Sequence, residues 1–193
     1  RVSALQYLSI ISLATGYPER AVQLQQQMLT EARQQDHPLY LGYALLMSAV
    51  NPCLLRNNDN VVQDLAQELA DLGATRGLPI FHSWGMFLQG WVQSRRGQAE
   101  QGIARMRRAV ADWQAGGAAT GRPFQLVLMA DACLHAGEVE QGLRVVSEAL
   151  AFAEQSEMRL CQAELHRLQG ELLRSMGDSV RGSRQAETLT PQA

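Results

Sequence analysis

The sequence predicts an all-α protein built from repeated pairs of antiparallel helices, and two observations lead to this fold class. A phrase recurs: RRGQAEQGI at 95–103 is followed forty residues later by HAGEVEQGL at 135–143. Apolar residues between the recurring phrases are spaced by three and four, which is the period of one helix face, and no strand-like alternation is present. Self-similarity at such a fixed period is typical of helical-repeat proteins.

Turn signals recur at the same period of about 40 residues. They stand at Gly16, Asn57, Gly97, Gly137 and Gly177. Glycine and asparagine tolerate the left-handed backbone conformation that commonly ends a helix. Pro18, two residues after the first of these turns, suits the first turn of the next helix. We therefore expect one helix to end and another to begin at each of the five positions.

These turns divide the chain into five helix pairs, the last of them incomplete. The expected first helices are 2–15, 38–56, 79–96, 122–136 and 158–176. The expected second helices are 18–35, 59–76, 98–116 and 138–156. The stretch VVQDLAQELADL illustrates the pattern, because Val61, Val62, Leu65, Leu69 and Leu72 fall on one helical stripe.

Small residues recur at two places in each pair except the second, which has valine at both. Seven positions before the turns stand Ser9, Val50, Gly90, Ala130 and Gly170, and five positions after them stand Ala21, Val62, Gly102 and Gly142. Glycine inside a helix costs up to about 1 kcal/mol relative to alanine. We therefore expect Gly90, Gly102, Gly142 and Gly170 to lie where paired helices approach closely.

This arrangement of small residues and turns resembles the tetratricopeptide repeat family. The resemblance covers nearly the whole chain and is strongest over 84–178, through the stretches 88–118, 122–143 and 163–178. It implies a right-handed superhelical solenoid of antiparallel helix pairs, with a unit of about 40 residues instead of the family's roughly 34. It also implies one domain over 1–178, of about 4.5 helix pairs. We expect 179–193 to be a disordered tail or a truncated next repeat.

The longer repeat unit also resembles the sensor regions of bacterial multidomain signalling ATPases, such as maltose-regulator-like activators and nucleotide-cyclase-linked ATPases. The resemblance implies a non-catalytic module of a larger regulator, which binds a protein, a peptide or a small effector. Other domains of the same parent chain would be further partners. The parent's ATPase or cyclase chemistry would lie outside this chain, because the sequence contains no phosphate-binding loop.

The same resemblance places a concave groove along the first helices. Carried over residue by residue, the groove would include Trp84, Phe87, Trp91 and Arg95 in the third pair, Phe124 and Asp131 in the fourth, and Arg167 in the fifth. One hypothesis is that the aromatic residues hold apolar side chains of a peptide, while Arg95 or Arg167 pairs with a carboxylate. The alternative is that the aromatic residues fill the core between the helices. The sequence leaves both open.

Composition excludes several other classes of function. The net charge is −2 and the pI about 6.1, which argues against nucleic acid as a main partner. All 17 basic residues are arginine, so a Schiff-base lysine is impossible. The three cysteines and four histidines are scattered, so we expect neither a metal site nor a cofactor.

Two pairs of residues could suggest catalysis. Glu164 and Glu171 could do acid–base work, but they stand seven residues apart and more simply balance the charges of Arg167 and Arg174. Asp131 and His135 stand at i and i+4, where they can form an ion pair on a helix. As a catalytic pair they lack a nucleophile: Ser94 is the nearest candidate, and nothing in the sequence brings it into reach. We therefore expect no catalytic residues, and a solenoid enzyme is the least favoured alternative.

The two ends of the chain carry further expectations. The chain begins at Arg1, so we expect it to be a piece of a longer protein. No apolar run approaches the roughly 18 residues that cross a membrane, and no signal segment opens the chain, so we expect a cytoplasmic location without a membrane partner. An uncapped last helix, with Leu165, Leu168, Leu172 and Leu173, would favour a homodimer through the open C-terminal end, so a structural oligomerisation scaffold is the main alternative function.

Overall fold

A computed structural model describes the chain except for residues 36, 56–57, 116–120, 157–158 and 190–193, and it describes side chains in the last helix up to Asp178. The described residues form nine α-helices and one short 3-10 helix, with no strand among them. The first four helices are α1 (Val2–Ala14), α2 (Pro18–Gln35), α3 (Pro38–Leu55) and α4 (Asp59–Thr75). The others are α5 (Pro79–Arg95), α6 (Ala99–Ala115), α7 (Arg122–Ala136), α8 (Val139–Ser156), η1 (Arg159–Cys161) and α9 (Gln162–Leu189). The predicted all-α class is confirmed.

The helix boundaries follow the predicted turns closely as far as α8. Gly16, Gly97 and Gly137 have φ angles of 86°, 86° and 71°, which is the left-handed region that glycine adopts without strain. In the second pair Asn58 has a φ of 66°, and the predicted turn residue Asn57 lies outside the described residues. These turns reverse the chain, so that α1 packs on α2, α3 on α4, α5 on α6 and α7 on α8.

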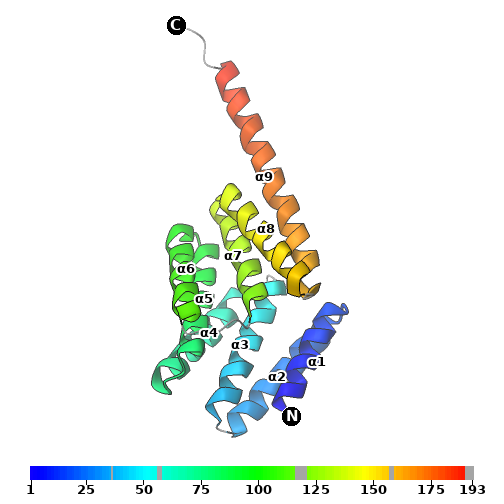
Figure 1. Ribbon diagram of the computed structural model, residues 1–193, viewed down its shortest axis with the longest axis vertical. Coiled ribbons are helices and arrows are strands. Elements are labelled where there is room, and N and C mark those ends of the chain that lie inside the picture. Colours follow the sequence, from blue (N-terminus) through cyan, green and yellow to red (C-terminus); the bar gives the residue numbers. More distant parts are fainter. Residues whose placement is uncertain (36, 56–57, 116–120, 157–158, 190–193) are drawn as a thin grey trace. The chain divides into compact units, whose positions relative to one another are not determined.

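The helices fall into two compact units, residues 1–120 and residues 121–193. In the first unit the second helices α2 and α4 also pack on the next first helices, α3 and α5, and α5 is buried on most of its surface. In the second unit α8 packs on both α7 and α9, with η1 beside them (Figure 1). Both units therefore use the same contact, in which a second helix lies between two first helices.

Close approach at small residues is confirmed in the first and third pairs. A methyl group on Gly90 would lie 2.7 Å from the carbonyl oxygen of Gly102, and one on Gly102 would lie 2.5 Å from that of Gly90. In the first pair the Ser9 hydroxyl donates a hydrogen bond of 3.1 Å to the Ala21 carbonyl. Gly85 makes the corresponding approach between pairs, because a methyl group there would meet the α4 backbone at Ala66 and Ala70.

The fifth pair differs from the sequence prediction. The expected first helix 158–176 instead begins at Gln162, after η1, and α9 runs without a break to Leu189 (orange to red in Figure 1). Gly177, the expected turn, therefore lies inside a helix. Nothing packs against the helix at Gly177, and one exposed glycine costs a helix only about 1 kcal/mol, so a helix can continue through it.

Two further expectations about α9 were wrong. Gly170 was expected at a close helix contact, but it is exposed, and a methyl group added there would meet no atom within 4 Å. Leu165, Leu168 and Leu172 were expected on an open face, but they are at most 1% exposed. Leu172 packs against α8 at Gly142. Only Leu173 of the four leucines, at 47% exposure, lies on an open face of α9.

Candidate functional site

The three aromatic residues of α5 lie in the core. Trp84 is 2% exposed, and Phe87 and Trp91 are fully buried. The rings of Trp84 and Phe87 pack edge to face, with centroids 5.6 Å apart. Of the two interpretations that the sequence left open, the structure favours the core over an open peptide groove for these residues.

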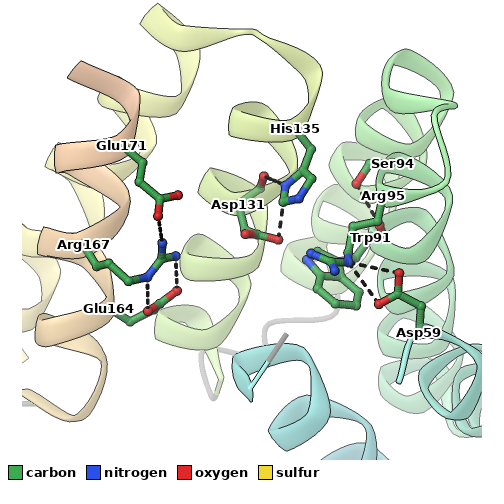
Figure 2. A network of polar contacts seen from close by, with 9 residues as sticks. All are labelled: Asp59, Trp91, Ser94, Arg95, Asp131, His135, Glu164, Arg167 and Glu171. Carbon is green, nitrogen blue, oxygen red and sulfur yellow. Dashed lines mark hydrogen bonds and ion pairs between the residues drawn. The ribbon is translucent and has the colours of Figure 1, made fainter. Parts of the chain in front are cut away.

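Arg95 is held by two partners of the first unit (Figure 2). Its guanidinium lies over the Trp91 ring, 4.9 Å from the ring centroid. Its Nε donates to the Asp59 carboxylate, with distances of 3.0 and 3.1 Å to the two oxygens. Asp59 is the first residue of α4 and Arg95 is the last residue of α5. Each side chain therefore carries a charge opposite in sign to the partial charge at its own helix end, which is a favourable interaction. A ligand carboxylate would have to compete with Asp59 for this arginine.

Asp131 and His135 lie on α7 in the second unit. The His135 Nδ1 lies 2.8 Å from the Asp131 main-chain oxygen and 3.7 Å from its carboxylate. A carbonyl oxygen only accepts, so Nδ1 carries the proton. Phe124, at the start of the same helix, is half-buried. Ser94, the nucleophile that we considered, donates its hydroxyl hydrogen bond to the Trp91 carbonyl at 2.7 Å, within its own helix.

Arg167 lies between two carboxylates of its own helix, α9. Its Nε and one terminal nitrogen donate to Glu164 at 2.7 and 2.6 Å, and the other donates to Glu171 at 2.5 Å (Figure 2). The hydrogen bonds to Glu164 and Glu171 outweigh partial burial and raise the pKa of Arg167 above its usual value. Two carboxylates around one guanidinium leave a net negative cluster, which disfavours an incoming carboxylate.

The structure therefore joins the predicted site residues in small local groups: Trp84 with Phe87, Trp91 with Arg95, Asp131 with His135, and Arg167 with its two glutamates. Each group lies within a single compact unit. Every group is explained by packing or by internal ion pairing. None presents an open anchor for a peptide.

The outer face of α1 is an open surface that the sequence interpretation missed. Tyr7, Leu8 and Ile11 are 65%, 46% and 56% exposed, although a helix of a folded domain usually turns such residues inward. Ala4, one turn before Leu8, is exposed on the same face. Single exposed apolar residues are common, but four at this spacing make a continuous stripe.

The repeat shows that this stripe is a contact face elsewhere in the chain. Tyr7 stands nine residues before its turn, and the residues at that position in α3, α5 and α9 are Ser48, Leu88 and Leu168, which are 7%, 0% and 0% exposed. Ile11 corresponds to Val92 in α5 and Leu172 in α9, both fully buried. The α1 face could therefore have been found in the sequence, because its apolar residues stand at repeat positions that are covered by the preceding helix elsewhere in the chain.

The helix that covers this face is known for α5 and α9. At the position of Ala4, α5 has Gly85, which approaches Ala66 and Ala70 of the preceding α4. At the position of Ile11, α9 has Leu172, which contacts Gly142 of the preceding α8. Among the described residues, α1 contacts α2 and α3, and neither of these helices covers Tyr7, Leu8 or Ile11, which stay exposed. Its outer face, defined by Ala4, Tyr7, Leu8 and Ile11, is the candidate functional site.

The described residues contain no group of three or more histidine, cysteine or acidic side chains placed to hold a metal ion. None of their helices combines the length and the apolar character that crossing a membrane requires.

Comparison with known proteins returned no relatives: no protein-family model, no curated protein and no solved structure matches the chain.

Proposed function

We propose that the chain is a non-catalytic interaction module that binds an amphipathic helix of a partner on the outer face of α1. The observation that carries this proposal is the exposure of Tyr7, Leu8 and Ile11 at repeat positions that are buried in later first helices. An apolar stripe on one helix is the surface that a helical partner recognises through residues spaced by three and four.

The chemistry of the partner follows from the helix that covers α5. Where α4 meets α5 it presents small side chains, Ala66 and Ala70, and its Gly73 approaches the α5 backbone at His82. The partner helix would therefore carry small residues at i, i+4 and i+7. It would lie somewhat farther from α1 than α4 lies from α5, because Ala4 has a methyl group for which the contact at Gly85 leaves no room. Bulky residues at these places would keep the partner away from Ala4.

The proposal extends to the fold and the context that the family resemblance implies. The helix pairs would stack as a right-handed superhelical solenoid, and the chain would be the sensor part of a larger bacterial signalling regulator in the cytoplasm. The partner helix would then come from another domain of that regulator or from a separate protein. The small-effector alternative has no support from the groove residues, since Trp84, Phe87 and Trp91 are buried.

A second candidate function, a scaffold for homo-oligomers, is favoured by the exposure of Leu173 and Met176 on α9, at 47% and 42%. Light scattering across a range of protein concentrations separates the two. A scaffold forms a dimer that Leu173→Gln disrupts, while a helix-binding module stays a monomer until its partner is added.

The test of helix binding uses a peptide with the sequence of residues 59–75, which is the helix that covers the same face of α5. In an NMR titration with the isotope-labelled protein, we expect shifts at Ala4, Tyr7, Leu8 and Ile11, and loss of these shifts in Ile11→Glu. Gln26→Glu on the exposed side of α2 is the control and should leave them unchanged. Absence of α1 shifts up to millimolar peptide would contradict the proposal.

A further inference from the structure

The face of α9 around Gly170 is open, whereas the same face of the other first helices is covered. Gly170 corresponds to Ser9, Val50, Gly90 and Ala130, all of which are buried. In the first and third pairs this residue touches the second helix of its own pair, through Ser9 with Ala21 and Gly90 with Gly102. Leu173 is also exposed, although its counterparts Cys53 and Cys133 are 2% and 0% exposed.

The second helices share a register of buried residues. Their buried positions stand five, nine and twelve residues after the turn. In α2 they are Ala21, Gln25 and Met28, in α4 Val62, Ala66 and Leu69, in α6 Gly102, Met106 and Ala109, and in α8 Gly142, Val146 and Ala149. The position seven after the turn is exposed in all four helices. Each second helix therefore has a fixed register of buried residues, and in the third pair Gly102 and Met106 of this register contact Gly90.

The sequence after Gly177 has the same register. Gly182, Ala186 and Leu189 stand five, nine and twelve residues after it, and Arg184 stands at the exposed seventh position. Gly182 repeats the glycine that α6 and α8 have at the fifth position. The chain thus contains a segment with the covering pattern of a second helix directly after the first helix that lacks one.

Gly177 is suited to the turn that such a segment requires. The corresponding Gly16, Gly97 and Gly137 all adopt positive φ angles in their turns. In α9 Gly177 is helical, so the two arrangements of the segment differ mainly in the backbone of this residue and its neighbours. Glycine reaches both conformations without a steric penalty.

We propose that residues 178–189 fold back on α9 as the second helix of the fifth pair, in exchange with the extended α9, and that Gly182 then seats on Gly170. Folding back covers Leu173 and completes a helix pair of the kind seen four times earlier in the chain. The exchange makes the open face of α9 available only when this segment is displaced. The inference is independent of the proposed role of α1.

A disulfide between positions 170 and 182 tests the proposal. In the extended helix these residues are twelve positions apart, which is about 18 Å along the axis. A disulfide requires Cα atoms within about 7 Å. We therefore expect Gly170→Cys with Gly182→Cys, in a chain whose three natural cysteines are replaced, to form an intramolecular disulfide on mild oxidation. Mass spectrometry of the monomer fraction measures it.

Two control pairs of cysteines are compared with the 170–182 pair. Ser9→Cys with Ala21→Cys occupies the same two positions of the first pair and should cross-link. Gly170→Cys with Arg184→Cys places the second thiol on the outer side of the folded-back segment and should cross-link at least tenfold more slowly. If the 170–182 pair reacts no faster than the 170–184 pair while the first-pair control reacts, the fold-back is wrong. A 170–182 disulfide found only between two chains overturns it as well, because a second copy then supplies the covering helix.

A backbone variant gives an independent readout. Gly177→Ala favours the helical conformation of residue 177 and disfavours a positive φ angle. We expect it to slow formation of the 170–182 disulfide at least fivefold and to leave the first-pair control unchanged. An unchanged rate in Gly177→Ala would show that no turn forms at this residue and would overturn the proposal.

Discussion

Gly90 of α5 and Gly102 of α6 lie back to back, each so close to the other's carbonyl oxygen that neither position has room for a methyl group. Gly170 holds the same place in α9 and faces open space. One repeat position therefore has opposite environments within a single chain, and substitution by alanine distinguishes them.

Gly90→Ala should destabilise the protein by about 1–3 kcal/mol, because the added methyl group forces α5 and α6 apart. Gly170→Ala should stabilise the extended α9 by up to about 1 kcal/mol, since alanine is the better helix former and meets no neighbour in that arrangement. Urea unfolding of the two variants measures both values. Equal effects of the same sign would contradict the helix contacts described for these positions.

Asp59 and Arg95 should couple energetically across α4 and α5. A double-mutant cycle with Asp59→Asn and Arg95→Met is expected to give a coupling of about 0.5–1 kcal/mol, which falls as salt is added, since the pair is partly exposed. Arg96→Met is the matched control, because Arg96 contacts Asn60 instead. Its coupling to Asp59→Asn should be within about 0.3 kcal/mol of zero. A coupling to Asp59 as large for Arg96 as for Arg95 would mean that the ion pair is not specific.

Cys161 should be an unreactive thiol in the folded protein. Burial, followed by repulsion from Glu164, raises the pKa of Cys161 to about 11. In a chain where Cys161 is the only cysteine, native-state labelling at pH 8 should be much slower than labelling of the unfolded chain, and it should accelerate toward pH 11. Rapid native labelling at pH 8 would show that the thiol is not buried.

The raised pKa of Cys161 also predicts how the stability of the protein changes with pH. A group whose pKa is raised by folding stabilises the folded state below its unfolded pKa of about 9 and loses that contribution as the pH rises through 11. The contribution of Cys161 to the fall in the free energy of unfolding between pH 9 and 11 is on the order of 2–3 kcal/mol. Cys161→Ala should remove this contribution, so that the free energy of unfolding falls less over the same pH range. Identical pH profiles for the variant and the parent would exclude this contribution.

Ile11 and Val92 occupy one repeat position with different exposure, 56% and 0%. Ile11→Gln should change the free energy of unfolding by less than about 0.5 kcal/mol and should reduce binding of an apolar dye. Val92→Gln should cost about 3 kcal/mol or more, because it buries an amide without partners. Thermal melts and dye fluorescence measure both. A large loss of stability in Ile11→Gln would show that the α1 face is already covered.

Most of the fold was predictable because the turn residues carry local information. Gly16, Gly97 and Gly137 reverse the chain for reasons of backbone geometry that hold wherever the residue stands. Gly177 is also a glycine at the repeat position of a turn, but it lies inside α9. A turn is realised only when the segment beyond it gains enough from packing, and that depends on tertiary contacts and not on the glycine itself.

The candidate site was less predictable for the same reason. Trp84, Phe87 and Trp91 have the spacing of a groove face, but periodicity does not tell whether a neighbouring helix covers that face. Arg95 and Arg167 are the right residues to bind a carboxylate, but Asp59 and Glu164 already supply one. In α1, Tyr7 and Ile11 look like ordinary core residues until their exposure is compared with that of Leu88 and Val92.

The most direct measurement of the central claim, that the outer face of α1 accepts a second helix, is a graft. Residues 59–82 are fused in place of Arg1, in the register in which they precede Ser83 in the chain, so that a copy of α4 can cover Tyr7, Leu8 and Ile11. The graft carries Ala4→Gly, because the α4 backbone leaves no room for a methyl group at the equivalent Gly85. We expect urea unfolding to show a gain of at least about 2 kcal/mol, from burial of these side chains, and dye binding to fall. The same graft with both alanines that correspond to Ala66 and Ala70 changed to glutamate should give no gain. A graft that leaves the urea midpoint and the dye binding unchanged would contradict the claim.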